Sequence, residues 1–164
     1  LQREQEFEQL EVKIRNIRMD EYEDELKKLY GFLSSALKNN FLFTPISWEA
    51  FYANYLKAAS FINPEYVLLA ENLKGDIIGF IFSYDDLINT SKKNLVFKTI
   101  VRDAAKKWAG LGHVMSNQVI RKVKNKGYDC FIHAFMLEQG SSTGLSKSFK
   151  GNIYKNYSLY GLKI

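Results

Sequence analysis

The sequence predicts a single α/β (α+β) domain built on a central mixed β-sheet flanked by helices. Segments with strand and helix periodicity alternate along most of the 164 residues, a length that suits one domain. Residues 66–71 and 77–84 are apolar runs joined by a glycine-containing turn, which is typical of an antiparallel hairpin. Residues 95–137 follow the order strand, loop, helix, strand, whose two strands normally run parallel.

The N-terminal half begins with a polar, acidic extension over residues 1–11, and residues 12–164 form the predicted domain. Alternating apolar side chains predict a first strand over residues 12–19. Asp20 has the character of a helix N-cap, and apolar residues at helical spacing follow it. Ser47 has the same character and predicts the start of a second helix.

The C-terminal half contains one more predicted helix, over residues 112–126, with Gly127 at its C-terminal cap. Residues 128–137 are apolar on both faces, which predicts a central strand with Cys130 packed in the core. A Gly/Ser-rich stretch follows, and residues 157–164 are the candidate for a last strand.

Composition narrows the class of protein. Hydrophobic residues make up 46% of the chain and charged residues 25%, as in globular proteins. A single cysteine allows no internal disulfide, and we expect a cytoplasmic protein. The absence of a long apolar run or a signal-peptide pattern argues against a membrane partner. Two histidines and one cysteine offer no metal-ligand cluster, so no metal is expected.

The charge is distributed unevenly. Residues 1–86 carry 9 Lys/Arg and 15 Asp/Glu, whereas residues 87–164 carry 14 Lys/Arg and 3 Asp/Glu. The second half therefore has the charge to meet an anion, although a solvated basic surface has the same composition. Nucleic acid is disfavoured as the partner because no recognised binding motif accompanies the charge.

The stretch that carries chemistry lies between a predicted strand and a predicted helix. Lys107 opens it, and Gly110 and Gly112 follow at G-x-G spacing. Backbone amides at a helix N-terminus form an anion site, and glycines let a phosphate approach closely. Met115 occupies the third position of the dinucleotide-binding fingerprint, and the P-loop signature is also absent. A tight turn without a ligand is the alternative interpretation.

This loop resembles the acyl-CoA loop Q/R-x-x-G-x-G/A of the GNAT superfamily of N-acetyltransferases, with Lys107 where that family has Gln or Arg. The predicted order of elements also resembles the GNAT order over nearly the whole chain. Further stretches are similar to a little-characterised bacterial GNAT subgroup: residues 40–47, 98–99, 132–136 and 157–160. The Pro that often follows the fourth GNAT strand is absent, and Gly140 stands roughly where the family has Asn after the fifth.

The resemblance implies a GNAT fold with a β-α-β acyl-CoA-binding core, acetyl-CoA as acyl donor and an amine of unknown identity as acceptor. The backbone of Ile100 and Arg102 would pair with the pantetheine amides, and Ser142 would contact the same arm. The diphosphate would be held by the amides of Trp108, Ala109, Gly110, Leu111, Gly112 and His113, with Lys106 and Lys107 nearby.

The candidates for the catalytic acid follow from the resemblance. Many GNAT enzymes use a tyrosine after the fifth strand to protonate the leaving thiolate, which makes Tyr157 and Tyr154 the candidates, with Tyr160 behind them. Each is also a plausible packing residue. The candidates for a base, acting directly or through water, are Glu71, Asp85, Asp86 and Glu138, and the alternative for each is a solvated carboxylate. His133 is expected to be a hydrogen-bonded core residue of the strand, with a catalytic role as the alternative.

Two functions stay open at this point. The first is N-acetyl transfer to an amine, and the second is a catalytically inactive GNAT-fold module that binds CoA or a protein. A homodimer and a further domain N-terminal to this chain are also left open as partners.

Overall fold

A computed structural model of the chain describes residues 2–89, 91–138 and 140–162. It divides into two compact units, Leu1–Ala134 and Phe135–Ile164. The first unit holds the sheet and four of the helices, and the second holds one helix and an extended tail. The boundary predicted at residue 12 stays a prediction.

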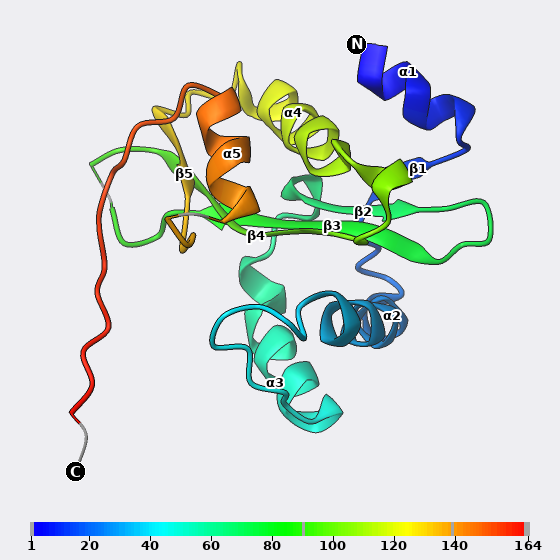
Figure 1. Cartoon of the computed structure of the whole chain (residues 1–164), viewed down its shortest axis with the longest axis horizontal. Coiled ribbons are helices and arrows are strands. Elements are labelled where there is room, and N and C mark those ends of the chain that lie inside the picture. The colour runs from blue at the N-terminus through cyan, green and yellow to red at the C-terminus, as the bar shows by residue number, and fades with distance from the viewer. Residues whose placement is uncertain (1, 90, 139, 163–164) are drawn as a thin grey trace. The chain divides into compact units, whose positions relative to one another are not determined.

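The sheet has five strands in the order β1-β2-β3-β4-β5. The first four pair antiparallel, and β5 pairs with β4 in parallel, which confirms the predicted mixed sheet (Figure 1). The strands are β1 (Lys13–Asn16), β2 (Val67–Glu71), β3 (Ile77–Asp85), β4 (Asn94–Arg102) and β5 (Cys130–His133).

Helices cover both faces of the sheet (Figure 1). Helices α2 and α3 pack on one face through a core that includes Leu26, Phe51 and Phe80. Helix α4 packs on the other face through a core that includes Leu111 and Met115, where α1 joins it. The bounds are α1 (Gln2–Gln9), α2 (Tyr22–Ala36), α3 (Trp48–Ala58), α4 (Leu111–Val123) and α5 (Ser141–Ser148), with 3₁₀ turns η1 (Ala59–Phe61), η2 (Pro64–Tyr66) and η3 (Lys106–Trp108).

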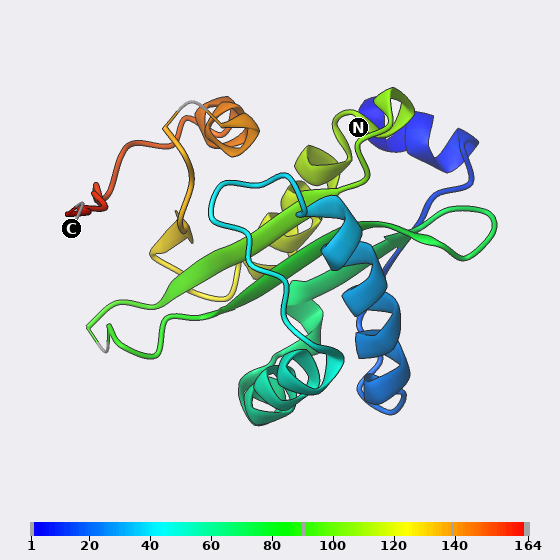
Figure 2. The ribbon, with the colours of Figure 1, turned by 60° about the horizontal axis from the view of Figure 1, so that its bottom comes forward.

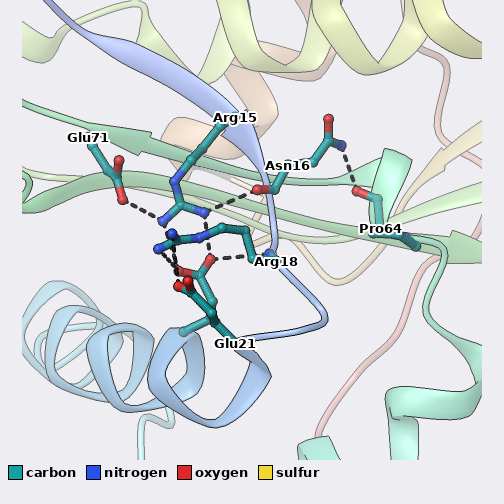
Figure 3. A network of polar contacts seen from close by, with 7 residues as sticks. Arg15, Asn16, Arg18, Glu21, Pro64 and Glu71 are labelled. Atoms are coloured by element: carbon teal, nitrogen blue, oxygen red, sulfur yellow. Dashed lines mark hydrogen bonds and ion pairs between the residues drawn. The ribbon is translucent and has the colours of Figure 1, made fainter.

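A buried ionic network fixes α2 against the sheet (Figure 3). Arg15 on β1 donates to both oxygens of Glu25 at 2.6 and 2.9 Å and to Glu71 at 2.5 Å. Arg18 adds a 3.0 Å bond to Glu25 and pairs with Glu21 at 2.8 Å. Glu25 is fully buried, and burial opposes its ionisation, but the hydrogen bonds from Arg15 and Arg18 outweigh this and lower its pKa.

A β-bulge interrupts β4 in the middle. Phe97 pairs with Ser83 and Thr99 pairs with Phe82, so Lys98 has no counterpart on β3. Because side chains alternate along a strand, one extra residue reverses which face each later side chain meets.

The reversal is visible on either side of the bulge. Phe97 packs in the core on the α4 face, and Ile100, three residues on, packs against the same core. Thr99, two residues after Phe97, instead lines a cavity with residues of α2 and α3. The bulge therefore turns Thr99 toward one face of the sheet and Ile100 toward the other.

Several sequence predictions need correction. Strand β5 was expected to be central but lies at the end of the sheet, with Phe131 37% exposed and Cys130 exposed instead of packed in the core. An apolar run predicts that a strand is buried, but it does not predict which other strands or helices lie beside it. Asp20 does not cap α2, because Glu21 stands at the N-cap without a side-chain bond.

The C-terminal segment also differs from its prediction. The Gly/Ser-rich stretch forms α5, and residues 157–162 form no strand, while Lys163 and Ile164 lie outside the described residues. Other predictions are confirmed, among them the hairpin of β2 and β3 and the Ser47 cap, whose Oγ accepts from the Ala50 amide at 3.3 Å.

Candidate functional site

The glycine loop lies between β4 and α4, as the sequence predicts. Its first turn is the 3₁₀ turn η3, which ends in the buried ring of Trp108. Gly110 is the N-cap of α4 and has φ 90°, a conformation that favours glycine. Leu111 is fully buried and anchors the first residue of the helix in the core.

The first turn of α4 presents backbone amides. The Val114 amide donates to the Gly110 carbonyl at 3.1 Å, which is the first i→i−4 hydrogen bond of the helix. The amides of Leu111 and Gly112 come before it, at the positive end of the helix dipole. A Cβ at Gly112 would lie 3.3 Å from the Ile100 side chain, so this glycine lets helix and strand approach closely. His113 is half-buried in the same turn.

Cationic side chains surround the loop. Arg3 of α1 lies against Gly110, where a Cβ would be 3.0 Å from its Nε. Arg3 also pairs with Glu6, both groups being substantially exposed. Lys107 places its Nζ 4.5 Å from the ring centre of Trp108, and Lys106 is exposed beside it. The structure thus adds Arg3 to the cations that the sequence indicated.

Helix α1 is held in place by α4. Glu4 accepts from Arg121 at 2.6 Å and from Gln118 at 3.0 Å, and these hydrogen bonds lower the pKa of Glu4. Phe7 is buried in the core on the α4 side. The sequence predicts a polar extension over residues 1–11, whereas the structure has helix α1 there. Phe7, an aromatic residue among polar ones, is the sequence feature that indicates packing of this segment.

Strand β4 has an open edge beside the loop (Figure 2). Its pairing with β5 covers only Asn94–Phe97, followed by a 3.1 Å bond from the Ala134 amide to the Phe97 carbonyl. Among the described residues, 98–102 have a strand neighbour on the β3 side alone. Ile100 and Arg102, the predicted pantetheine contacts, both lie on this open stretch.

A cavity of about 210 Å³ lies on the face of the sheet opposite to α4, between α2, α3 and the chain that connects these two helices. This connection passes across the sheet in Figure 2, and its residues line the same cavity as Thr99 of β4. No motif pointed to this cavity. Its lining residues are Tyr30, Leu33, Ser34, Leu37, Phe43, Thr44, Ile46, Phe51, Tyr55 and Thr99.

The predicted catalytic tyrosines lie in the other unit of the chain. Tyr154 and Tyr157 are 65% and 71% exposed, and the Tyr157 ring is 5.3 Å from that of Phe135. Ser142 lies in the first turn of α5 in the same unit. The roles proposed for these three residues stay predictions.

Three of the four carboxylates predicted as base candidates have structural partners. Glu71 accepts from Arg15, and Asp85 accepts from the Tyr128 hydroxyl at 2.5 Å. Asp86 accepts from the Ile88 amide at 3.2 Å, and Glu138 is exposed in the C-terminal unit. Hydrogen bonds of this kind are typical of carboxylates with a structural role.

His133 lies at the end of β5, where the pairing with β4 stops. Its ring meets the edge of Phe97, which belongs to the core on the α4 face. Burial lowers the pKa of His133, so the imidazole is neutral at pH 7. The His133 ring therefore lies on the α4 side of the sheet, and Thr99 lines its cavity on the other side.

Among residues 2–89, 91–138 and 140–162, no group of three or more His, Cys, Asp and Glu side chains is arranged to hold a metal ion. Within the same described part of the chain, no helix has both the length and the apolar character that a membrane span requires.

No protein-family model matches the chain, and no curated protein matches its sequence. Solved structures match it over nearly its full length. An aminoglycoside acetyltransferase from an uncultured soil metagenomic sample, solved with sisomicin, covers 96% of this chain and 99% of its own, with a TM-score of 0.64 and 13% identity. An aminoglycoside N-acetyltransferase in complex with CoA has a TM-score of 0.64 at 15% identity, covering 93% of this chain and 95% of its own.

A third match has a different substrate in its name. Glucosamine-6-phosphate N-acetyltransferase from Arabidopsis thaliana has a TM-score of 0.60 at 17% identity, covering 91% of this chain and 97% of its own. At these identities the likeness establishes the fold. The mixed sheet, the helices on its two faces and the order of its elements show that this chain has the GNAT fold of the N-acetyltransferases.

Proposed function

We propose that this chain is an acyl-CoA-dependent N-acyltransferase that transfers an acetyl group from acetyl-CoA to an amine. The observation that carries the proposal is the open edge of β4 at residues 98–102, which leads into the glycine N-cap of α4 within a GNAT fold. The acetyltransferase names of the structural neighbours support the same reaction class, and one of those neighbours was solved with CoA.

The residues present fit the donor. The predicted diphosphate ligands are the backbone amides from Trp108 to His113. Those of Trp108 and Ala109 donate to the Ala105 and Lys106 carbonyls within η3, at 3.0 Å each, so the proposed contact is the stretch that begins at Gly110, the N-cap of α4. Arg3, Lys106 and Lys107 supply positive charge around them. The backbone of Ile100 and Arg102 lies on the open edge and is proposed to pair with the pantetheine amides.

The transfer requires three events. The amine nitrogen attacks the thioester carbonyl and loses a proton, the carbon–sulfur bond breaks, and the departing thiolate gains a proton. Tyr157 is the first candidate for the proton donor, and Tyr154 is the second. The candidates for the base are a water molecule and Glu138, because Glu71, Asp85 and Asp86 already accept bonds from Arg15, Tyr128 and Ile88.

The alternative is a CoA-binding module without transferase activity. The observation that favours it is the exposure of Tyr154 and Tyr157 together with the structural partners of the carboxylates. Both functions use the same loop, so they differ in turnover and not in CoA binding.

Thiol release from acetyl-CoA separates the two functions. Wild type is expected to release thiol with a panel of amines, and Tyr157→Phe is expected to lose about 10²–10⁴-fold in rate while keeping its CoA affinity. Tyr154→Phe is the matched variant from the same segment. Full rate in both variants would assign the proton donor elsewhere, and CoA binding without transfer to any amine would favour the inactive module.

A further inference from the structure

We infer that the cavity lined by Thr99 is the acceptor site, and that its acceptor is a small primary monoamine with an uncharged aromatic or branched alkyl body. This inference rests on the proposed acyl transfer, because an acceptor has meaning only where an acyl group is transferred.

The position of the cavity follows from the bulge in β4. Thr99 lies on the open stretch of the strand, and its side chain faces α2 and α3 because Lys98 reverses the alternation. The neighbouring Ile100, a proposed pantetheine contact, faces α4. The cavity and the proposed path of the acyl arm therefore meet at adjacent residues of one strand.

The chemistry of the lining selects the class of amine. Seven of the ten described lining residues are aliphatic or aromatic: Tyr30, Leu33, Leu37, Phe43, Ile46, Phe51 and Tyr55. The other three, Ser34, Thr44 and Thr99, offer hydroxyl groups. None of these described lining residues is charged. A polyamine or a phosphorylated sugar would therefore meet no counter-charge in this lining, whereas an amine with an apolar body would remove apolar surface from water against it.

Tyr55 does not supply a negative charge either. Burial raises its pKa above the usual value for tyrosine, so its hydroxyl is neutral at physiological pH. A single amine can enter as the neutral base that the reaction needs, whereas additional ammonium groups would stay charged.

The aromatic rings of the lining pack against one another and form one wall of the cavity. The ring centres of Phe51 and Tyr55 are 4.5 Å apart, and those of Tyr30 and Phe51 are 5.3 Å apart. The Tyr30 hydroxyl donates to the Ile46 carbonyl at 2.9 Å, which ties the connection between α2 and α3 to α2. Because a drug-sized ligand needs about 300–1,000 Å³, a cavity of about 210 Å³ suits a small one.

The test measures kcat/KM for acetyl transfer by thiol release with wild-type protein. Phenethylamine and isoamylamine are the expected acceptors. Spermidine, sisomicin and glucosamine 6-phosphate are the more highly charged amines measured for comparison. The monoamines are expected to lead by at least about tenfold, the scale that one unsuitable group in a pocket typically produces.

A charge-introducing variant tests the site itself. Ser34→Asp adds a carboxylate to the lining, and Ser35→Asp adds one to the same helical turn outside the lining, both residues being exposed. Only Ser34→Asp is expected to shift the preference from phenethylamine toward spermidine, by about fivefold, as one solvent-exposed ion pair allows. Circular dichroism melting checks that both variants fold.

The outcomes distinguish this inference from the proposed function. Transfer that prefers the charged amines, or equal behaviour of Ser34→Asp and Ser35→Asp, overturns the inference and leaves acyl transfer standing. Absence of transfer to every amine, with CoA bound or not, overturns the proposed function and the inference with it.

Discussion

At the scale of single residues, Glu25 is a charged side chain that lies fully buried in the sheet unit. It accepts two bonds from Arg15 and one from Arg18 while fully buried. Glu25→Gln is expected to lower the free energy of unfolding by about 3 kcal/mol, because it removes the buried charge that both arginines bind and leaves the largely buried Arg15 with Glu71 as its ion-pair partner. Urea unfolding measures the loss.

Glu23→Gln is the matched control on the same helix. Its carboxylate is 54% exposed and pairs with Lys27 at 2.9 Å, so its removal is expected to cost less than about 1 kcal/mol. Equal losses in the two variants would contradict the role of the buried network.

The effect of Glu25 is expected to depend on pH with a definite sign. Because its pKa is lowered in the folded state, the ionised group stabilises the fold above the unfolded pKa of about 4.3. That contribution is lost as the pH falls through the folded pKa. The stability gap between wild type and Glu25→Gln should therefore be full at pH 7 and shrink in acid, and a gap that widened in acid would contradict the assignment.

Residue identities could predict part of the candidate site. Gly110 and Gly112 follow an apolar strand at G-x-G spacing, so the loop was predictable from local sequence alone. The bulge at Lys98 was not, because it depends on which residue of β3 each residue of β4 meets. Without the bulge, alternation along β4 places Thr99 on the wrong face, and the acceptor cavity escapes prediction.

At the scale of elements, helix α1 is the feature that links the N-terminal segment to the loop. Glu4 and Phe7 attach it to α4, and this attachment places Arg3 against Gly110. Arg3→Gln is expected to weaken CoA binding by about fivefold, or about 1 kcal/mol, at low salt. The loss should diminish at high ionic strength, where exposed charges are screened.

Lys74→Gln is the control for Arg3→Gln. It removes one exposed charge from the turn between β2 and β3, far along the chain from the loop. Calorimetry with CoA at two salt concentrations is the measurement. Equal affinities of the Arg3 and Lys74 variants would exclude Arg3 from the anion site.

Helix caps and hairpins could be predicted from the sequence, because they depend on residues that are close together in the chain. The Ser47 cap and the hairpin of β2 and β3 follow from side-chain chemistry and alternation within a few residues. The place of β5 at the end of the sheet depends on which segments cover it, and an apolar run carries no such information. The same holds for residues 157–162, whose strand-like pattern has no partner strand among the described residues.

At the scale of the whole sheet unit, one strand separates two kinds of site. The α4 face carries the glycine loop and its cations, and the α2 and α3 face carries the uncharged cavity. The open stretch of β4 lies between them, which is the arrangement that a two-substrate transfer needs: a polyanionic donor from one side and an apolar amine from the other.

The most direct test of this account is a calorimetric titration of CoA into wild type, Gly110→Val and Gly75→Val. Both glycines have positive φ, 90° and 81°, so valine strains either backbone by roughly 1–2 kcal/mol, but only Gly110 lies in the loop. The account predicts that wild type and folded Gly75→Val bind CoA alike and that folded Gly110→Val binds it at least about tenfold more weakly. Absence of CoA binding to wild type, or unchanged binding by Gly110→Val, would contradict it.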